Sequence, residues 1–371
     1  MTVFDPLWLA WIAGFVLCAR ASPSAVRPFA MAGLTLVFIA ETDIVSAIIL
    51  TAMTLVTSRF GLRAGAGFAV IGTVIATFLG ALAAFKLTRN DELGVVMPLG
   101  MSYYTFRCIH YLLERLKQRL PPHSFAEFLS YMFFMPALTA GPIHRFGQFH
   151  RDLRRPHPLS SQVSEGLERV LYGYAKIVIL ANFVVEQLMR DASASLTEAA
   201  PRASAYIDML AGGFNGYLQF AGYSDIVIGV ALLSGFRIIE NFNNPLAARN
   251  IIEFWQRWHI SLTSWVREYL YTSVFSLTRR PYFAALLTML AIGLWHEISW
   301  RYVIWGLAHG LAVAGCQLYR KIRAKPATTR FGSTAVAWFA TFHFVMLSFV
   351  LVQHDFSGAL AVYRLLILGA G

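Results

Sequence analysis

Long apolar segments recur along almost the whole of this chain, and they constrain its fold more than any other feature. A lipid bilayer offers no partners to backbone N–H and C=O groups, so a segment that crosses it must be a helix or part of a closed barrel. A helix of about 20 apolar residues spans the hydrocarbon core. The chain is 57% hydrophobic and only 14% charged, whereas soluble domains carry roughly 25% charged residues. The pattern predicts an all-α polytopic membrane protein.

Segments of suitable length and composition predict about ten to eleven transmembrane helices. Segment 204–235 is long enough for a kinked span or two half-spans. Segment 125–146 is apolar but contains Pro136, Gly141 and Pro142, which predicts a re-entrant or interfacial hairpin. The predicted spans are 6–19, 28–40, 44–58, 65–86, 94–113, 167–189, 204–235, 282–296, 300–319, 334–352 and 358–370.

An aromatic and basic segment follows at 249–275. Spacings of three and four residues separate Trp255, Trp258, Leu262, Trp265, Tyr269 and Thr272. This spacing predicts a helix with one aromatic stripe, lying flat on the membrane or entering a polar cavity. We find no internal repeat, and the loops are short. Residues 1–371 are therefore expected to form a single integral-membrane domain, with 321–333 as the most linker-like stretch.

The net charge of +11 and the pI near 9.8 need not indicate a nucleic-acid partner. The basic residues cluster in short loops between apolar segments, as the positive-inside rule predicts for a membrane protein. Contact with anionic lipid is therefore expected, and nucleic acid is not. Cys18, Cys108 and Cys316 lie far apart, which favours apolar packing over a disulfide or a metal site.

Ionisable side chains interrupt the apolar stretch AIGLWHEISWRYVIWGLAHG, residues 291–310. A charge at the bilayer centre costs at least about 2.5 kcal/mol, so such residues are candidates for function. Histidine side chains in general titrate near neutral pH, so a histidine at position 296 is suited to proton transfer. Structural roles are the alternative: His296 bonded to a carbonyl, Glu297 paired with Arg301, and His309 in close helix packing.

Two functional classes fit a buried histidine beside a water-accessible cavity: an acid/base enzyme and a proton-coupled transporter. His296 and Glu297 do not form a zinc-protease motif, because Trp300 stands where H-E-x-x-H needs its second histidine. A transporter typically has broken helices in repeated halves. The absence of such a repeat in the sequence favours the enzyme.

Several motifs occur in one order along the chain. MPLGMSYYTFRCIHYLLE (97–114) and FFMPALTAGPIHRF (133–146) precede FAGYSD, ENFNNP and EFWQRWHISLTSW, and GLWHEISWRYVIWGLAHG follows. Together they resemble the bacterial membrane-bound O-acyltransferase (MBOAT) family, which includes alginate O-acetylases and the D-alanyl transfer proteins of teichoic acid modification. The resemblance covers roughly 95–312, which leaves 1–94 and 320–371 as peripheral transmembrane helices.

The resemblance implies a ring of helices, with re-entrant or interfacial helices, around a thinned centre and a central tunnel. The catalytic histidine of the family's W-H motif is His296 here. His259 occupies the position of a second polar residue, 37 residues earlier. Arg257 and Arg267 are expected to meet an anionic donor. The residues expected to line the tunnel or contact substrate are Trp255, Trp258, Trp295, Asn241, Asn243, Glu297 and His309.

The activity that the resemblance implies is transfer of a small acyl group, most simply acetyl, to a hydroxyl of a cell-envelope or exported polysaccharide. His296 acts as general base. The donor is a cytoplasmic thioester, acetyl-CoA or an acyl-carrier phosphopantetheine, and no bound cofactor is expected. The expected location is the bacterial inner (cytoplasmic) membrane, which the chain crosses several times.

The implied partners are the bilayer, the polysaccharide, and either a periplasmic SGNH-like acyltransferase or a cytoplasmic carrier protein. Glu297 stands where the family usually has glycine, and the chain is nearer in length to the D-alanyl transfer proteins. D-alanyl transfer from a carrier protein to an envelope polymer is therefore an alternative, and a non-catalytic acyl conduit or transporter is another.

Overall fold

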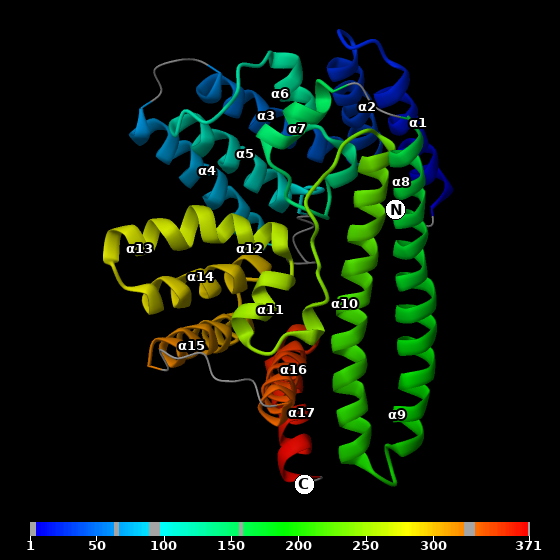
Figure 1. Cartoon of the computed structure of the whole chain (residues 1–371), viewed down its shortest axis with the longest axis vertical. Helices are drawn as coiled ribbons and strands as arrows, with labels where there is room; N and C mark the ends of the chain where they lie inside the picture. Colours follow the sequence, from blue (N-terminus) through cyan, green and yellow to red (C-terminus); the bar gives the residue numbers. More distant parts are fainter. Residues whose placement is uncertain (1–4, 63–66, 89–96, 156–158, 323–330, 370–371) are drawn as a thin grey trace. The chain divides into compact units, whose positions relative to one another are not determined.

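A computed structural model describes residues 5–62, 67–88, 97–155, 159–322 and 331–369 (Figure 1). The first residues of the predicted spans 65–86 and 94–113, the end of 358–370, and most of the linker-like stretch lie outside these ranges. Every regular element within the described ranges is a helix, as predicted. The chain divides into two compact units, one of residues 1–172 and 224–239, the other of residues 173–223 and 240–371.

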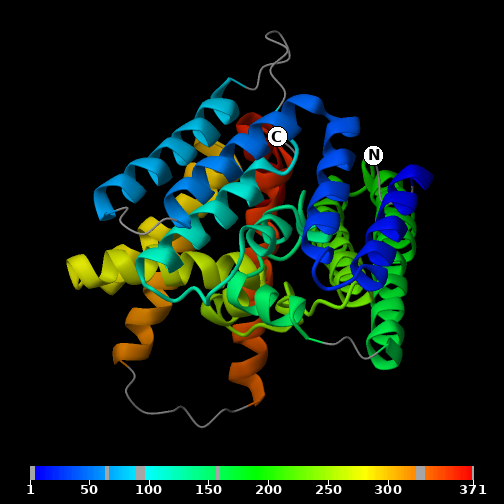
Figure 2. The same ribbon diagram turned by 90° about the horizontal axis from the view of Figure 1, so that it is seen from above.

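The ends of the first four helices of the first unit lie within about three residues of the predicted spans, whereas the fifth helix begins at Met101, well after the predicted start of 94–113. The side chains of Asp5 and Asp43 accept hydrogen bonds from the first turns of α1 and α3, as N-caps do. Helix α5 packs against both α3 and α4 (Figure 2). The helices are α1 (Pro6–Ala21), α2 (Arg27–Thr42), α3 (Ile44–Gly61), α4 (Phe68–Leu87) and α5 (Met101–Leu116).

The segment predicted as a hairpin, 125–146, is indeed broken into short pieces. It contains α6 (Phe125–Met132) and the 3₁₀ turn η2 (Met135–Ala137), and α7 (Phe146–Leu153) follows. The buried guanidinium of Arg107 donates to the carbonyls of Met132, at 2.8 Å, and Ala137. Arg107 thereby satisfies carbonyl groups that the helix breaks leave without helical partners.

Glu127 joins three parts of this segment. Its carboxylate accepts from the backbone N–H of Ser124 at 2.7 Å, which completes a capping box, and from Arg154 Nε at 2.7 Å. His150 lies 3.4 Å away. Burial opposes ionisation of Glu127, but the hydrogen bonds from Arg154 and Ser124 outweigh it and lower its pKa to about 2.

Replacing Glu127 by glutamine is expected to destabilise the protein at neutral pH by about 1–2 kcal/mol, because the cap and the charge-assisted bonds are weakened. A depressed pKa stabilises the folded state above the unfolded pKa and loses that effect as the pH falls through the folded one. The difference in unfolding midpoint between wild type and E127Q, measured in detergent, should therefore shrink from about pH 4.5 towards pH 2. A difference that does not change with pH would contradict this assignment.

A long helical hairpin belongs partly to each unit. Its first arm is α8 (Leu159–Ala175), the π-helical segment η3 (Lys176–Met189) and α9 (Arg190–Leu196), and its second arm is α10 (Pro201–Leu233). The second arm is one continuous helix of 33 residues, so the pair of half-spans considered for 204–235 was wrong. Glycines permit this close packing: a Cβ at Gly222 would lie 2.7 Å from the carbonyl oxygen of Gly173.

The rest of the second unit is built of shorter helices. Segment 249–275 was predicted as one helix, but it bends at Trp258 and His259 into separate pieces. Helices α14 and α15 form a closely packed antiparallel hairpin (Figure 1). The elements are η4 (Pro245–Ala247), α11 (Ile251–Arg257), α12 (Ile260–Val266), η5 (Arg267–Tyr271), α13 (Thr272–Thr278), α14 (Pro281–His296), α15 (Trp300–Ile322), α16 (Phe331–Gln353) and α17 (Phe356–Leu368).

Five of the described helical segments are long and apolar enough to cross a membrane. Helices α1, α14 and α17 are apolar but shorter. The membrane character predicted from composition thus appears in the helices, whereas the number of ten to eleven transmembrane helices stays a prediction. The five segments are Ile44–Gly61, Phe68–Leu87, Ser161–Leu196, Pro201–Leu233 and Thr334–Gln353.

Candidate active site

The α14–α15 hairpin fixes the position of His296, the last residue of α14. Close approach of the two helices depends on glycine: a Cβ at Gly306 would lie 2.9 Å from the carbonyl oxygen of Met289, and one at Gly293 would collide with the carbonyl of Tyr302. Glu297 leaves the helix in an extended conformation. His296 therefore sits at a rigid corner, and its side chain is exposed.

His259 is positioned by the bend between α11 and α12. The carbonyl of Asn241 accepts from the N–H of Ile260 at 2.9 Å, and its side-chain oxygen accepts from Ser261 at 2.8 Å. The N–H of Asn243 donates to the carbonyl of Arg257 at 3.0 Å. His259 itself has φ +43°, a left-handed conformation uncommon for residues other than glycine. Such strain persists where the surroundings impose it, often at functional sites.

One cavity, which we call the histidine cavity, brings the two histidines together. Its volume is about 90 Å³, room for roughly three water molecules at about 30 Å³ each. His259 is only 2% exposed, whereas His296 is open to the surface. The cavity therefore runs from an open histidine to a buried one. Its lining includes Trp255, Trp258, His259, His296, Tyr302 and His309.

Aromatic rings surround both histidines. The ring centroid of Trp295 lies 4.6 Å from that of His296 and 6.2 Å from that of His259. Tyr302 stacks on His296 at 5.7 Å, with ring planes 20° apart. Phe220 contacts His259 edge-on at 4.8 Å. These rings limit the water that can surround the imidazoles and fix the ring orientations.

Three buried polar atoms of the lining residues have no hydrogen-bond partner within the described parts of the chain. They are Nε2 of His259, Nδ1 of His309 and Nε1 of Trp255. The other ring nitrogen of His309 lies 3.0 Å from the hydroxyl of Ser348. An unsatisfied buried polar group costs about 1–3 kcal/mol. The histidine cavity is thus suited to a polar guest that supplies the missing partners.

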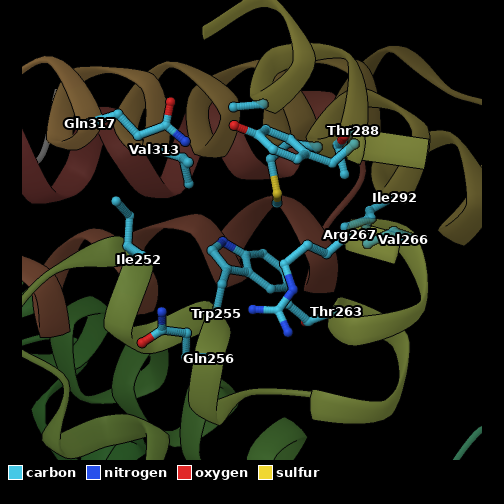
Figure 3. A pocket seen from close by; sticks show the side chains of 13 residues that line it. Ile252, Trp255, Gln256, Thr263, Val266, Arg267, Thr288, Ile292, Val313 and Gln317 are labelled. Atoms are coloured by element: carbon cyan, nitrogen blue, oxygen red, sulfur yellow. The ribbon is translucent and has the colours of Figure 1, made fainter. Parts of the chain in front are cut away.

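A second cavity, which we call the apolar cavity, adjoins the first, with Trp255 lining both. Its volume is about 230 Å³. Figure 3 shows the indole of Trp255 in the middle of the lining, with the guanidinium of Arg267 beside it. Within the described residues, no hydrogen bond or ion pair engages that guanidinium. Other lining residues are Gln256, Thr288, Met289, Ile292 and Gln317.

Several predicted site residues lie elsewhere. Arg257 pairs with Glu253 at 2.6 Å and contributes to neither cavity lining. Glu297 pairs with Arg301, whose Nε lies 3.0 Å from its carboxylate, as the structural alternative predicted. Asn241 and Asn243 shape the bend at His259, in agreement with the expected turn, and lie outside the two linings. Asn241, Asn243 and Glu297, which were expected to line the tunnel, thus lie outside both linings, as does Arg257, which was expected to meet the donor. Trp295 is also absent from both linings, although its ring contacts that of His296.

Sequence reasoning did not identify Tyr302, Trp305, Phe220 and Ser348 as lining residues. Tyr302 and Trp305 follow the W-H motif at a spacing of three, a helical pattern that points both side chains to one face. Ser348 is a single hydroxyl within the apolar segment 334–352, which was a weak but readable signal. Phe220 resembles any other core aromatic in the sequence.

Comparisons with known proteins identify relatives of the chain. The family described as MBOAT, membrane-bound O-acyltransferase family, matches residues 43–353. The chain is 35% identical over 270 residues to a probable alginate O-acetylase of Azotobacter vinelandii, a match that covers 70% of this chain and 52% of that protein. It thus spans about half the length of the alginate O-acetylases it matches. The matched range contains every residue of both cavities.

Two other relatives differ in their printed activities. A teichoic acid D-alanyltransferase of Streptococcus thermophilus is 30% identical over 308 residues, covering 75% of this chain and 72% of that protein. A peptidoglycan O-acetyltransferase of Helicobacter pylori is 30% identical over 294 residues, covering 70% of this chain and 54% of that protein. The relatives share transfer of an acyl group and differ in the group and its acceptor.

Proposed function

The chain belongs to the membrane-bound O-acyltransferase family, and we propose that it is an acyltransferase that transfers acetyl from a thioester to a hydroxyl of a cell-envelope or exported polysaccharide. The observation that carries this proposal is the histidine cavity, where an exposed histidine and a buried one meet. A hydroxyl is a weak nucleophile until a base accepts its proton, and an imidazole does so near neutral pH.

In the proposed mechanism, His296 accepts the proton of the acceptor hydroxyl as its oxygen attacks the thioester carbonyl carbon. The oxyanion that forms accepts a hydrogen bond from Nε2–H of His259, whose Nε2 has no partner in the described chain. The carbon–sulfur bond then breaks, and the thiolate takes the proton from the imidazolium of His296. The ester and the free thiol leave, and the histidine returns to its neutral form.

The donor is proposed to reach His296 through the apolar cavity. Thr288, Met289 and Ile292 line this cavity along α14, and His296 follows Ile292 by about one helical turn. Arg279 and Arg280 precede α14, and α15 ends with Arg320 and Lys321. A basic end of this kind faces the cytoplasm in membrane proteins. An acyl-pantetheine arm in the apolar cavity, with its phosphate near Arg267, fits this polarity.

Replacing Arg267 by glutamine is expected to raise the KM for acetyl-CoA about tenfold, because a charge-assisted contact to phosphate is lost, and to change kcat little. Arg249→Gln is the matched control, since Arg249 is exposed and lines neither cavity. Steady-state kinetics on each variant in lipid vesicles measures its KM and its kcat. Equal KM values for acetyl-CoA in the two variants would show that Arg267 does not contact the donor.

The protein is a membrane protein, and we place it in the bacterial inner membrane, crossed several times. The donor is proposed on the cytoplasmic side and the acceptor on the outer side. A periplasmic SGNH-like acyltransferase is the proposed partner for acceptors that cannot reach the cavity. For the D-alanyl alternative, the proposed partner is a cytoplasmic carrier protein.

D-alanyl transfer is the second candidate, because the D-alanyltransferase relative is matched over 72% of its length. The experiment that separates the candidates supplies vesicles with either acetyl-CoA or a D-alanyl carrier thioester and measures thiol release. Acetyl transfer predicts His296-dependent release from acetyl-CoA. Release only from the D-alanyl carrier would replace the proposed donor, and release that persists in H296A would favour the conduit.

A further inference from the structure

A third cavity lies in the second unit, between the tip of the α9–α10 hairpin and the corner where α16 meets α17. Its volume is about 540 Å³, larger than that of the histidine or the apolar cavity. We call it the hairpin-tip cavity. Arg190, Ser204, Asp208, Gln353 and His354 contribute its polar lining. Pockets of about 300–1,000 Å³ are typical for small ligands.

The polar lining offers both donors and acceptors. Arg190 bonds Glu186 at 2.6 Å and lies 3.8 Å from Asp208. The side chains of Arg190 and Asp208 line the cavity and are 43% and 48% exposed. At the end of α16, the amide of Gln353 and the imidazole of His354 make no side-chain hydrogen bond to any described residue. Met209 and Val350 supply buried apolar surface. Such a mixture suits a molecule with many hydroxyl groups and apolar C–H faces.

The hairpin-tip cavity is connected to the proposed catalytic base. Arg301 donates to the carbonyl of His354 at 2.8 Å and bonds Glu297, the residue after His296. The last turns of α16 contact both cavities: Phe349 and Val352 line the histidine cavity, while Val350 and Gln353 line the hairpin-tip cavity. The cavity therefore lies towards the His296 end of α14, away from the basic end.

The volume of the histidine cavity limits how much of the acceptor it can hold. A histidine cavity of about 90 Å³ has room for a hydroxyl and a small acyl group, and it is too small for a sugar ring with its neighbours. The rest of a polysaccharide acceptor must therefore bind outside it. The hairpin-tip cavity is a polar space joined to the same corner through Arg301.

Charge indicates the kind of saccharide. Arg190 is compensated by Glu186, and Asp208 adds a further carboxylate. Nearby, Arg301 is compensated by Glu297. The surroundings thus carry no excess of positive charge for a chain with one carboxylate per sugar, and like charges placed together repel.

We propose that the hairpin-tip cavity binds the acceptor, and that it recognises a neutral, hydroxyl-rich saccharide through Asp208 and Gln353. This inference rests on the proposed acyltransferase function and specifies its acceptor. Hydroxyls of the sugar next to the acylated one donate to the carboxylate of Asp208 and bond the amide of Gln353. Replacing either side chain leaves sugar hydroxyls without partners, which weakens acceptor binding.

The test uses the whole protein in vesicles, acetyl-CoA, and two matched acceptors that differ at C6: β-1,4-mannotetraose, which is neutral, and β-1,4-tetramannuronate, which is anionic. We expect a lower KM for mannotetraose, and an increase of about tenfold in that KM for D208N and Q353A. Thermal unfolding of each variant in detergent, compared with wild type, separates weaker acceptor binding from a loss of fold. Asp191→Asn, an exposed position on α9 outside the cavity, is the matched control.

Three results would overturn the proposal in distinguishable ways. If D208N and Q353A have the same KM for the acceptor as D191N, the hairpin-tip cavity does not bind the acceptor. The proposed acyltransferase function would not be contradicted by this result. Preference for tetramannuronate would overturn the neutral acceptor. Wild type that neither transfers nor hydrolyses acetyl in a His296-dependent manner would contradict the proposed function itself, and this inference with it.

Discussion

Replacing His296 by alanine is expected to lower kcat for acyl transfer by about 10²–10⁴-fold, because the acceptor hydroxyl loses the base that takes its proton. The exposed position of His296 at the corner of α14 and α15 means that the substitution leaves no buried hole, so the fold should be retained. The rate is measured as acceptor-dependent thiol release by protein in vesicles.

A matched control for this experiment is His343→Ala. His343 lies on α16 in the same unit, bonds Tyr206 at 2.7 Å and contributes to neither the histidine nor the apolar cavity. H343A should keep a rate close to that of wild type. An H296A protein as active as H343A would show that His296 is not the base.

Replacing His259 by alanine is expected to lower kcat by about 10²–10³-fold with a smaller effect on KM, since a donor to the oxyanion acts mainly in the transition state. Asparagine at this position should restore part of the rate. Its amide N–H also donates a hydrogen bond, and asparagine tolerates the left-handed backbone that His259 adopts at φ +43°.

The relative kcat values of H259A and H259N decide the role of His259. If H259N is as slow as H259A, hydrogen-bond donation does not explain the contribution of the residue. If both variants are fully active, His259 is a packing residue of the bend. Thermal unfolding of each protein in detergent separates these outcomes from a loss of fold.

Much of the helical framework could be predicted because it depends on local composition. The boundaries of α2, α3 and α14 follow from where apolar runs begin and end, since a membrane helix satisfies its own backbone. The break in 125–146 was also readable from Pro136 and Gly141. These features require no knowledge of what each segment packs against.

The bend at His259 could not be predicted in the same way. Residues 249–275 have helical periodicity throughout, and the break is imposed by hydrogen bonds that Ile260 and Ser261 donate to Asn241. Such bonds join residues about 20 apart in the chain, and the spacing of apolar residues within 249–275 does not indicate them. Tertiary contacts override local propensity here.

The two histidines were identified by resemblance, but their unequal exposure was not. A buried His259 and an open His296 follow from the bend and from the α14–α15 corner. Arg257, which was expected to meet the donor, lies outside both cavity linings and pairs with Glu253, four residues earlier on the same helix. The hairpin-tip cavity depends on the packing of two segments about 150 residues apart in the sequence and had no sequence signal.

The central claim is that His296 catalyses acyl transfer to an envelope saccharide. Its most direct test measures ester-linked acyl groups on envelope glycans from cells that lack this protein and carry either wild type or H296A at equal membrane levels. We predict that wild type restores the ester, that alkaline release yields acetate, and that H296A restores none. Full restoration by H296A would contradict the catalytic role, and release of D-alanine would replace acetyl as the transferred group.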